Sequence, residues 1–212
     1  MEVWDLYDRH RQIIGEHIRG TALPENGFHL VVHVWIRNDQ GEYLIAQRAA
    51  TRPTFPLKWE CVGGSVLKGE TSLQGALREV REEVGIPLEA KTGRIVFTKV
   101  RETIDGKPFN DIVDVWLFPY DGAVDLSAAT TDEVAQVRWM SAEEIEKLFA
   151  SGEMVHTIKT CSTLWRSKAH LETRRVERAG GGGGAKPQTL RSERSPAWDP
   201  CRSSGQIDKQ EE

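Results

Sequence analysis

The 212-residue sequence predicts an α/β fold on two observations. Segments of alternating and β-branched residues recur along the first 140 positions, and Gly, Pro, Asn and Asp residues that favour turns separate them. Two other segments carry apolar residues at helical spacing, each between a capping residue and a glycine. Strands and helices of this kind together indicate a mixed α/β domain.

The strand predictions depend on alternation and on turn residues. Residues 1–27 mix short apolar stretches with turn residues, so we expect a small hairpin or arm there. The sequences NDQG and IDGK each separate the two strands of a hairpin, and WECVGG predicts a short strand that enters a glycine turn. The expected strands are residues 29–38, 42–48, 59–64, 94–102, 108–120 and 134–140.

Two helices are predicted from their ends and their apolar faces. The first begins after Thr71, which forms a capping box with Gln74, and it ends at Gly85. The second covers residues 141–152 and begins with a capping box of Ser141 and Glu144. The first helix has one narrow apolar stripe, formed by Leu73, Ala76, Leu77, Val80 and Val84.

The composition changes after residue 165. Residues 166–212 contain five consecutive glycines and scattered arginines and serines, with almost no periodicity. Such a segment cannot bury enough apolar surface to offset the entropy of ordering, so a disordered tail is predicted. The predicted organisation is an arm over 1–27, a domain over 28–165 and a tail over 166–212.

Charge and cysteine content narrow the classes of function. The net charge is −4, and residues 1–165 carry 18 basic and 25 acidic side chains, which argues against specific nucleic-acid binding. No run approaches the roughly 18 apolar residues of a membrane span, and no signal peptide is evident. Three separated cysteines form no disulfide or zinc pattern. We expect a cytoplasmic protein without a membrane partner.

Three glutamates in the first helix raise the question of a metal site. Glu79, Glu82 and Glu83 have spacings that bring their carboxylates within a few ångströms, on a face expected to point away from the apolar stripe. The alternative is an ordinary solvated helix face. Hard divalent cations prefer such a cluster of oxygens, but the spacing alone leaves both interpretations open.

The surrounding sequence GSVLKGETSLQGALREVREEVGI (64–86) resembles the Nudix box of the Nudix hydrolases. That signature is Gly, five residues, Glu, seven residues, and then Arg-Glu-apolar-any-Glu-Glu-any-Gly-apolar. Seven positions of fixed identity would match by chance in roughly one chain per million. The resemblance covers residues 28–165 and implies an α/β/α sandwich with a mixed sheet. All nine positions are filled, by Gly64, Glu70, Arg78, Glu79, Val80, Glu82, Glu83, Gly85 and Ile86.

The resemblance also implies roles for the box residues. A Mg²⁺ or Mn²⁺ cofactor would bridge the protein to a diphosphate. Glu82 or Glu83 would deprotonate or orient the attacking water, and Arg78 would orient a box glutamate. Glu70 and Gly85 would support the local structure. The expected metal ligands are Glu79, Glu82, Glu83 and the carbonyl oxygen of Gly64.

Two residues outside the box are further candidates. Family members often recruit a carboxylate from a later loop, and Glu133 stands just before the last predicted strand. Its alternative is a solvated loop glutamate beside Asp132. Arg48 ends the second predicted strand, where it could touch a phosphate or could be a structural arginine on the surface.

The implied function is metal-dependent hydrolysis of a diphosphate linkage in a small molecule, namely a nucleoside diphosphate linked to a group X or a similar organic pyrophosphate. One alternative is a Nudix domain that senses a nucleotide without turnover. Another is an isopentenyl-diphosphate isomerase, because the N-terminal sequence resembles that branch. The isomerase Cys and His, in a Trp-x4-Cys-Gly-His arrangement, would fall at Gly64 and Val66, which disfavours that activity. Dimers are common in the family, so a homodimer is one candidate assembly, and the sequence alone leaves the oligomeric state open.

Overall fold

The computed structural model describes residues 2–104 and 106–156, and the tail predicted over 166–212 lies outside them. Nine strands and two α-helices occur within the described residues. The strands are β1 (Val3–Tyr7), β2 (Ile13–Ile18), β3 (Phe28–Arg37), β4 (Tyr43–Arg48), β5 (Trp59–Glu60), β6 (Val62–Ser65), β7 (Arg94–Ile104), β8 (Lys107–Pro119) and β9 (Val134–Met140). The α-helices are α1 (Ser72–Val84) and α2 (Ala142–Ser151), and two short 3-10 turns are Ala90–Thr92 and Leu126–Ala128.

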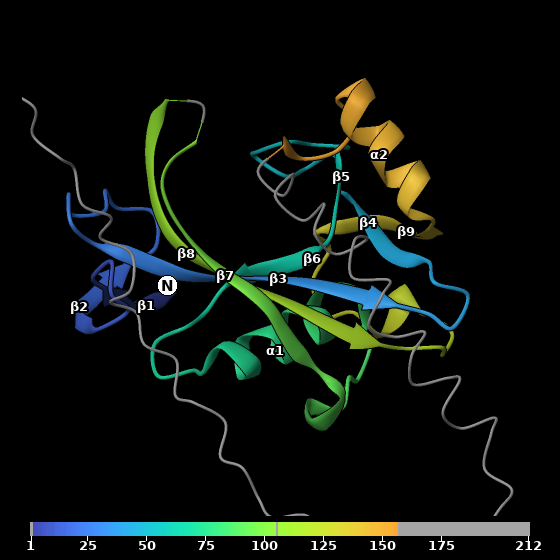
Figure 1. The fold of residues 1–212 in the computed structure, drawn as a ribbon, viewed down its shortest axis with the longest axis horizontal. Helices are drawn as coiled ribbons and strands as arrows, with labels where there is room; N and C mark the ends of the chain where they lie inside the picture. Colours follow the sequence, from blue (N-terminus) through green and yellow to red (C-terminus); the bar gives the residue numbers. More distant parts are fainter. Residues whose placement is uncertain (1, 105, 157–212) are drawn as a thin grey trace, which may run out of the picture. The chain divides into compact units, whose positions relative to one another are not determined.

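The described strands form one mixed sheet organised around β3 (Figure 1). Strand β3 pairs antiparallel with β1, β4 and β6. It pairs parallel with β8 over nine residue pairs, from His29–Asp111 to Arg37–Pro119. Strand β2 extends the sheet beyond β1, and β7 extends it beyond β8, while β5 and β9 both pair with β4. The parallel pairing makes the sheet mixed, as predicted.

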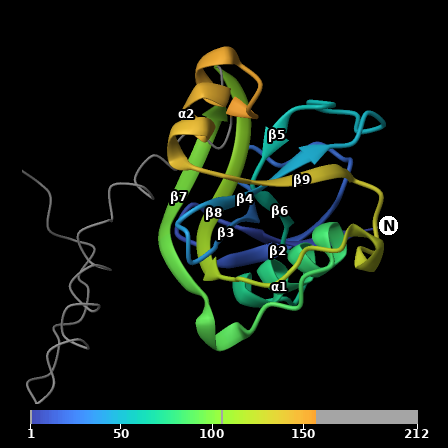
Figure 2. The same ribbon diagram turned by 90° about the vertical axis from the view of Figure 1, so that its right-hand side faces the viewer.

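The two α-helices cover opposite faces of this sheet (Figure 2). Alternate residues of β3 face one apolar core with Ala76, Val80 and Val84 of α1. Trp35 of the same strand faces the other core, together with Ile145 of α2. A strand directs successive side chains to opposite faces, so one strand serves both cores. The α/β/α sandwich expected from the sequence is confirmed.

Both helices begin and end where the sequence predicts. Thr71 accepts the Gln74 N–H while the Gln74 side chain accepts the Thr71 N–H, and Ser141 and Glu144 form the same reciprocal pair at α2. Gly85 ends α1 in the left-handed region, with φ of 71°. Such backbone angles are accessible to glycine at little cost, which explains the sharp end.

The hairpin expected within residues 1–27 is present as β1 and β2. It is joined to the main sheet by the pairs Leu6–His29 and Tyr7–Phe28. In the part of the chain that the structure describes, no helix has the length and apolar character needed to cross a membrane.

Candidate functional site

Two consecutive glycines of β6 lie where a side chain would not fit, one against strand β3 and the other against helix α1. Gly63 stands opposite His33 and Gly64 opposite Val32 in the antiparallel pairing of β6 with β3. A Cβ atom at Gly63 would overlap the Val32 carbonyl oxygen, and one at Gly64 would overlap the Glu79 carboxylate. Gly63 therefore allows β6 to lie close to β3, and Gly64 allows the strand backbone to approach the Glu79 carboxylate.

Arg78 is the cationic centre of the site. Its Nε and Nη2 atoms donate to the two carboxylate oxygens of Glu70 at 2.8 and 2.9 Å. Its Nη1 atom donates to Glu79 at 2.9 Å and to Glu82 at 3.0 Å. Its Nη2 atom also donates to the Ser65 carbonyl oxygen at 2.9 Å. One guanidinium thus connects the loop before α1 to two of the expected metal ligands.

Glu83 is buried and Glu79 is largely enclosed, and each lies beside like charges. Glu83 is 7% exposed, and its Oε2 atom accepts the Gly63 N–H at 3.3 Å. Burial raises the pKa of Glu83 well above its usual value, and the charges of Glu79 and Glu60 raise it further. Burial also raises the pKa of Glu79 to about 7, although Arg78 opposes that shift. Burial and mutual repulsion therefore disfavour the ionisation of Glu79 and Glu83 at the same time.

The prediction that all three glutamates face away from the apolar stripe is wrong for Glu83. This residue lies beside Val84 and one turn after Val80, both of which are fully buried. Its carboxylate accepts the Gly63 N–H of β6, so the side chain turns toward the sheet. Glu82 follows the prediction best, because its side chain is 38% exposed.

Two more carboxylates approach the site from other elements. Glu133, just before β9, and Glu60, on β5, both raise the pKa of Glu83 through their charge. Glu133 is a predicted candidate, and its carboxylate forms an ion pair with Arg52 instead of standing free in solvent. Glu60 is a residue that the sequence reasoning missed. The available signal is a lone charged residue inside the otherwise apolar strand sequence WECV.

Arg48 is buried, so its interpretation as a surface arginine is wrong. It is 9% exposed, and its guanidinium forms an ion pair with Glu60. Its Nε atom donates to the Thr54 carbonyl oxygen at 2.9 Å. The carboxylate of Glu60 compensates for the burial of the Arg48 charge, so the side chain can point inward. Contact of Arg48 with a phosphate remains a prediction.

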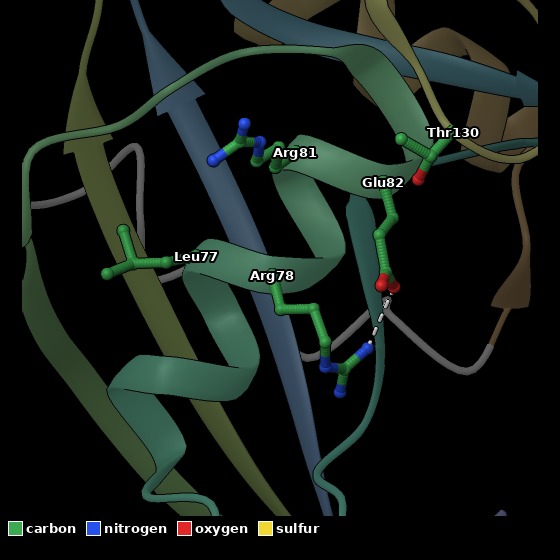
Figure 3. A pocket seen from close by; sticks show the side chains of 5 residues that line it. All are labelled: Leu77, Arg78, Arg81, Glu82 and Thr130. Atoms are coloured by element: carbon green, nitrogen blue, oxygen red, sulfur yellow. Dashed lines mark hydrogen bonds and ion pairs between the residues drawn. The ribbon is translucent and has the colours of Figure 1, made fainter.

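A pocket of about 400 Å³ opens beside the Arg78–Glu82 ion pair (Figure 3). Figure 3 shows the Glu82 and Arg78 side chains pointing toward each other. Thr130, from the segment between β8 and β9, lies near the end of α1. Thr130 and Thr131 both donate their backbone N–H to the Glu82 carbonyl oxygen, at 2.9 and 3.2 Å. The pocket is lined by Leu77, Arg78, Arg81, Glu82 and Thr130.

The donor chemistry of the site fits a hard divalent cation, because α1 supplies three carboxylates and Glu60 and Glu133 lie near enough for their charges to raise the pKa of Glu83. Among residues 2–104 and 106–156, no group of three or more acidic, cysteine or histidine side chains is already arranged to bind a metal ion. Arg78 holds Glu79 and Glu82 in their present positions. Coordination by all three glutamates would therefore require their side chains to move.

Comparison with known proteins places these features in a family context. The NUDIX domain family matches residues 27–160. An uncharacterised Nudix hydrolase of Listeria monocytogenes is 38% identical over 158 residues, which cover 73% of this chain and 89% of the relative. An isopentenyl-diphosphate Delta-isomerase of Cannabis sativa is 28% identical over 172 residues, covering 70% of this chain and 58% of that enzyme. A crystal structure from Deinococcus radiodurans has the same fold, with a TM-score of 0.59, 23% identity and coverage of 73% and 92%.

Proposed function

The chain belongs to the Nudix family and is a hydrolase acting on pyrophosphate bonds, and from that premise we propose a more specific reaction. The proposed reaction is hydrolysis, dependent on Mg²⁺ or Mn²⁺, of the diphosphate linkage in a nucleoside diphosphate linked to a group X or in a similar organic pyrophosphate. The observation that carries this proposal is the group of carboxylates on α1, in which Glu79 and Glu82 share the Arg78 guanidinium and Glu83 is buried beside them. Such a site attracts divalent cations, and it would repel an unaccompanied polyphosphate.

In this proposal each residue of the site has a defined task. Glu79, Glu82, Glu83 and the Gly64 carbonyl oxygen would hold the metal. When bound, the cation supplies neutralisation of phosphate charge, polarisation of a phosphoryl oxygen and acidification of water. Arg78 orients Glu79 and Glu82 through its two contacts from Nη1.

The proton of the attacking water needs an acceptor, which we assign to Glu82 or Glu83. Glu82 is the more exposed and borders the pocket, so it is accessible to a water molecule. Glu83 is buried, and its raised pKa gives it a high affinity for a proton. Glu133 is proposed as an additional carboxylate, because its charge acts on both Glu79 and Glu83.

The test is a panel of nucleoside diphosphate derivatives, nucleotide sugars, dinucleoside polyphosphates and prenyl diphosphates, each incubated with Mg²⁺. We expect cleavage of at least one class, a requirement for the metal, and loss of about 10³-fold in kcat in Glu82→Gln. Glu143→Gln, at an exposed position of α2, is the matched control and should keep full activity. Tight binding of a nucleotide without turnover across the panel would favour a sensor domain instead.

Isomerase activity is the weaker alternative despite the similarity to the Cannabis sativa enzyme. The positions for the isomerase Cys and His are Gly64 and Val66 here. Cys61 is 3% exposed within the core that α2 covers, so it packs as a small apolar side chain. The homodimer and the cytoplasmic location remain predictions, and light scattering of the purified protein would test the first.

A further inference from the structure

We propose that the β1–β2 hairpin positions the metal carboxylates, and that Asp5 is the positioning residue through which it acts. The hairpin contacts the loop 66–70, which leads into α1 (Figure 1). This inference rests on the proposed function, because it assigns a catalytic consequence to the geometry around Arg78. It makes the N-terminal hairpin a working part of the catalytic domain.

The hairpin binds two consecutive backbone amides of the loop. Lys68 N–H donates to the Val3 carbonyl oxygen at 2.8 Å. Gly69 N–H donates to the Asp5 carboxylate, also at 2.8 Å. The Lys68 side chain adds an exposed ion pair with Glu16 of β2. An exposed pair of this kind contributes little, so the hairpin holds the loop mainly through the two amide bonds. The Val66 N–H, at the start of the loop, donates to the Leu30 carbonyl oxygen of β3 at 2.9 Å, so the hairpin acts on the part of the loop nearest Glu70.

A short chain of hydrogen bonds links this loop to the carboxylates proposed to bind the metal. Gly69 has φ of 78°, in the left-handed region, and the next residue is Glu70. The Glu70 carboxylate accepts the Leu67 N–H at 3.0 Å, so the loop closes on itself. That same carboxylate holds Arg78 with two bonds, and Arg78 in turn holds Glu79. A shift of the loop at Gly69 therefore displaces the guanidinium that orients the metal ligands.

The turn of the hairpin makes a second attachment, at the first residue of α1. Arg11 donates from Nη1 and Nη2 to the two oxygens of Asp114 at 2.8 and 2.6 Å, and Asp114 is completely buried. Ser72 bonds to the same carboxylate and accepts the Trp116 Nε1–H at 2.9 Å. The hairpin thus holds both the loop and the start of the helix, which fixes the helix relative to the loop.

The experiment compares Asp5→Ala and Asp5→Asn with Arg19→Ala in the full chain. Arg19→Ala is the matched control, because it removes an ion pair with Glu2 on the same hairpin without touching the loop. Three quantities are measured: the Kd for Mn²⁺ by calorimetry, the NMR resonance of the Arg78 Nε–H, and kcat and KM with a cleaved pyrophosphate. Thermal unfolding of each variant checks the fold, and Asp5 is only partly buried, so both variants should remain folded.

For Asp5→Ala we expect a Kd for Mn²⁺ about fivefold higher, a kcat about fivefold lower with little change in KM, and a shifted Arg78 resonance. Asp5→Asn should recover most of each loss, because its amide oxygen can still accept the Gly69 N–H. Arg19→Ala should match the wild type. Asp5→Ala that matches the wild type in Mn²⁺ affinity and in the Arg78 resonance would overturn the inference, as would losses that Arg19→Ala shares.

These outcomes are separable from failure of the proposed function. A wild-type protein that cleaves no pyrophosphate in the panel would contradict the proposed reaction alone. The Mn²⁺ affinity and the Arg78 resonance need no turnover, so they still decide whether Asp5 positions the site.

Discussion

Two groups of buried carboxylates in this molecule are neutralised to very different degrees. Asp111 and Asp114 on β8 are completely buried, and each receives two bonds from an arginine, Arg101 and Arg11 respectively. On α1, by contrast, Arg78 is shared among Glu70, Glu79 and Glu82. Glu83, which is also buried, is bonded in the described structure to one backbone amide.

The pKa values reflect this difference. Burial raises the pKa of Asp114, but hydrogen bonds from Arg11, Ser72 and Thr98 outweigh it, so the pKa lies below its usual value. Burial and neighbouring charges leave the pKa values of Glu79 and Glu83 raised. Burial alone therefore does not distinguish the two groups, whereas the supply of positive charge does. Carboxylates neutralised by the protein stabilise the fold, and those left short of positive charge are suited to bind cations.

Glu83→Gln should give the largest effect, lowering the activity while raising the stability of the fold. Because the folded-state pKa is raised, the ionised carboxylate costs stability at pH values above its unfolded pKa, and the neutral amide removes that cost. We expect kcat to fall about 10³-fold while the free energy of unfolding without metal rises by about 1–2 kcal/mol. Kinetics and denaturant titration check the two effects. A variant that is both active and less stable would show that Glu83 stabilises the fold, as Asp111 and Asp114 do, instead of serving the reaction.

The neighbouring glycines allow a second test. Gly64→Ala would push the end of the flexible Glu79 side chain, so we expect about 10²-fold lower kcat with little change in Tm. Gly63→Ala would instead meet the backbone carbonyl of Val32, which cannot move easily, and we expect about 3 kcal/mol less stability. Equal stability losses in the two variants would show that the Glu79 carboxylate is as rigidly held as the strand.

Arg11→Ala should test how much the neutralisation of Asp114 contributes to stability. It leaves the Asp114 charge buried without its partner, and because Arg11 is itself 37% exposed we expect a loss of about 2 kcal/mol at pH 7. The folded-state pKa of Asp114 is depressed, so this stabilisation is present above the usual value of 3.8 and is lost as the pH falls through the lower folded pKa. Denaturant titrations at neutral and acid pH should show the difference from the wild type shrinking in acid.

The smallest expected effect comes from Arg78→Lys. Lysine keeps the charge but cannot reach Glu70, Glu79 and Glu82 with one planar group. We expect kcat to fall about tenfold with a change in Tm of only a few degrees, as measured by steady-state kinetics and thermal unfolding. An unchanged kcat would show that a point charge is sufficient at this position.

Local signals in the sequence predicted the elements well. Thr71 and Gly85 mark the two ends of α1 through capping and left-handed geometry, which depend only on neighbouring residues. The strand predicted over 134–140 coincides with β9. These features are determined within a few residues of the chain, so a single sequence is enough to predict them.

Long-range partners were not predictable in the same way. The pairing of Arg11 with Asp114 joins residues 103 positions apart, and no spacing rule connects them. Glu83 is buried beside β6, where it accepts the Gly63 N–H from a strand that lies 20 residues earlier, and Glu60 reaches the site because β5 pairs with β4. The resemblance to the box predicts the metal ligands, but only the tertiary structure shows which of these carboxylates bond to an arginine.

The parallel pairing of β3 with β8 has a consequence for synthesis on the ribosome. Residues 29–37 cannot complete their pairing until residues 111–119 have left the exit tunnel, and α1 emerges between the two. Contacts this distant in sequence slow folding, because a long loop must close before they form. The central parallel pairing of the sheet therefore forms only after most of the domain has been made.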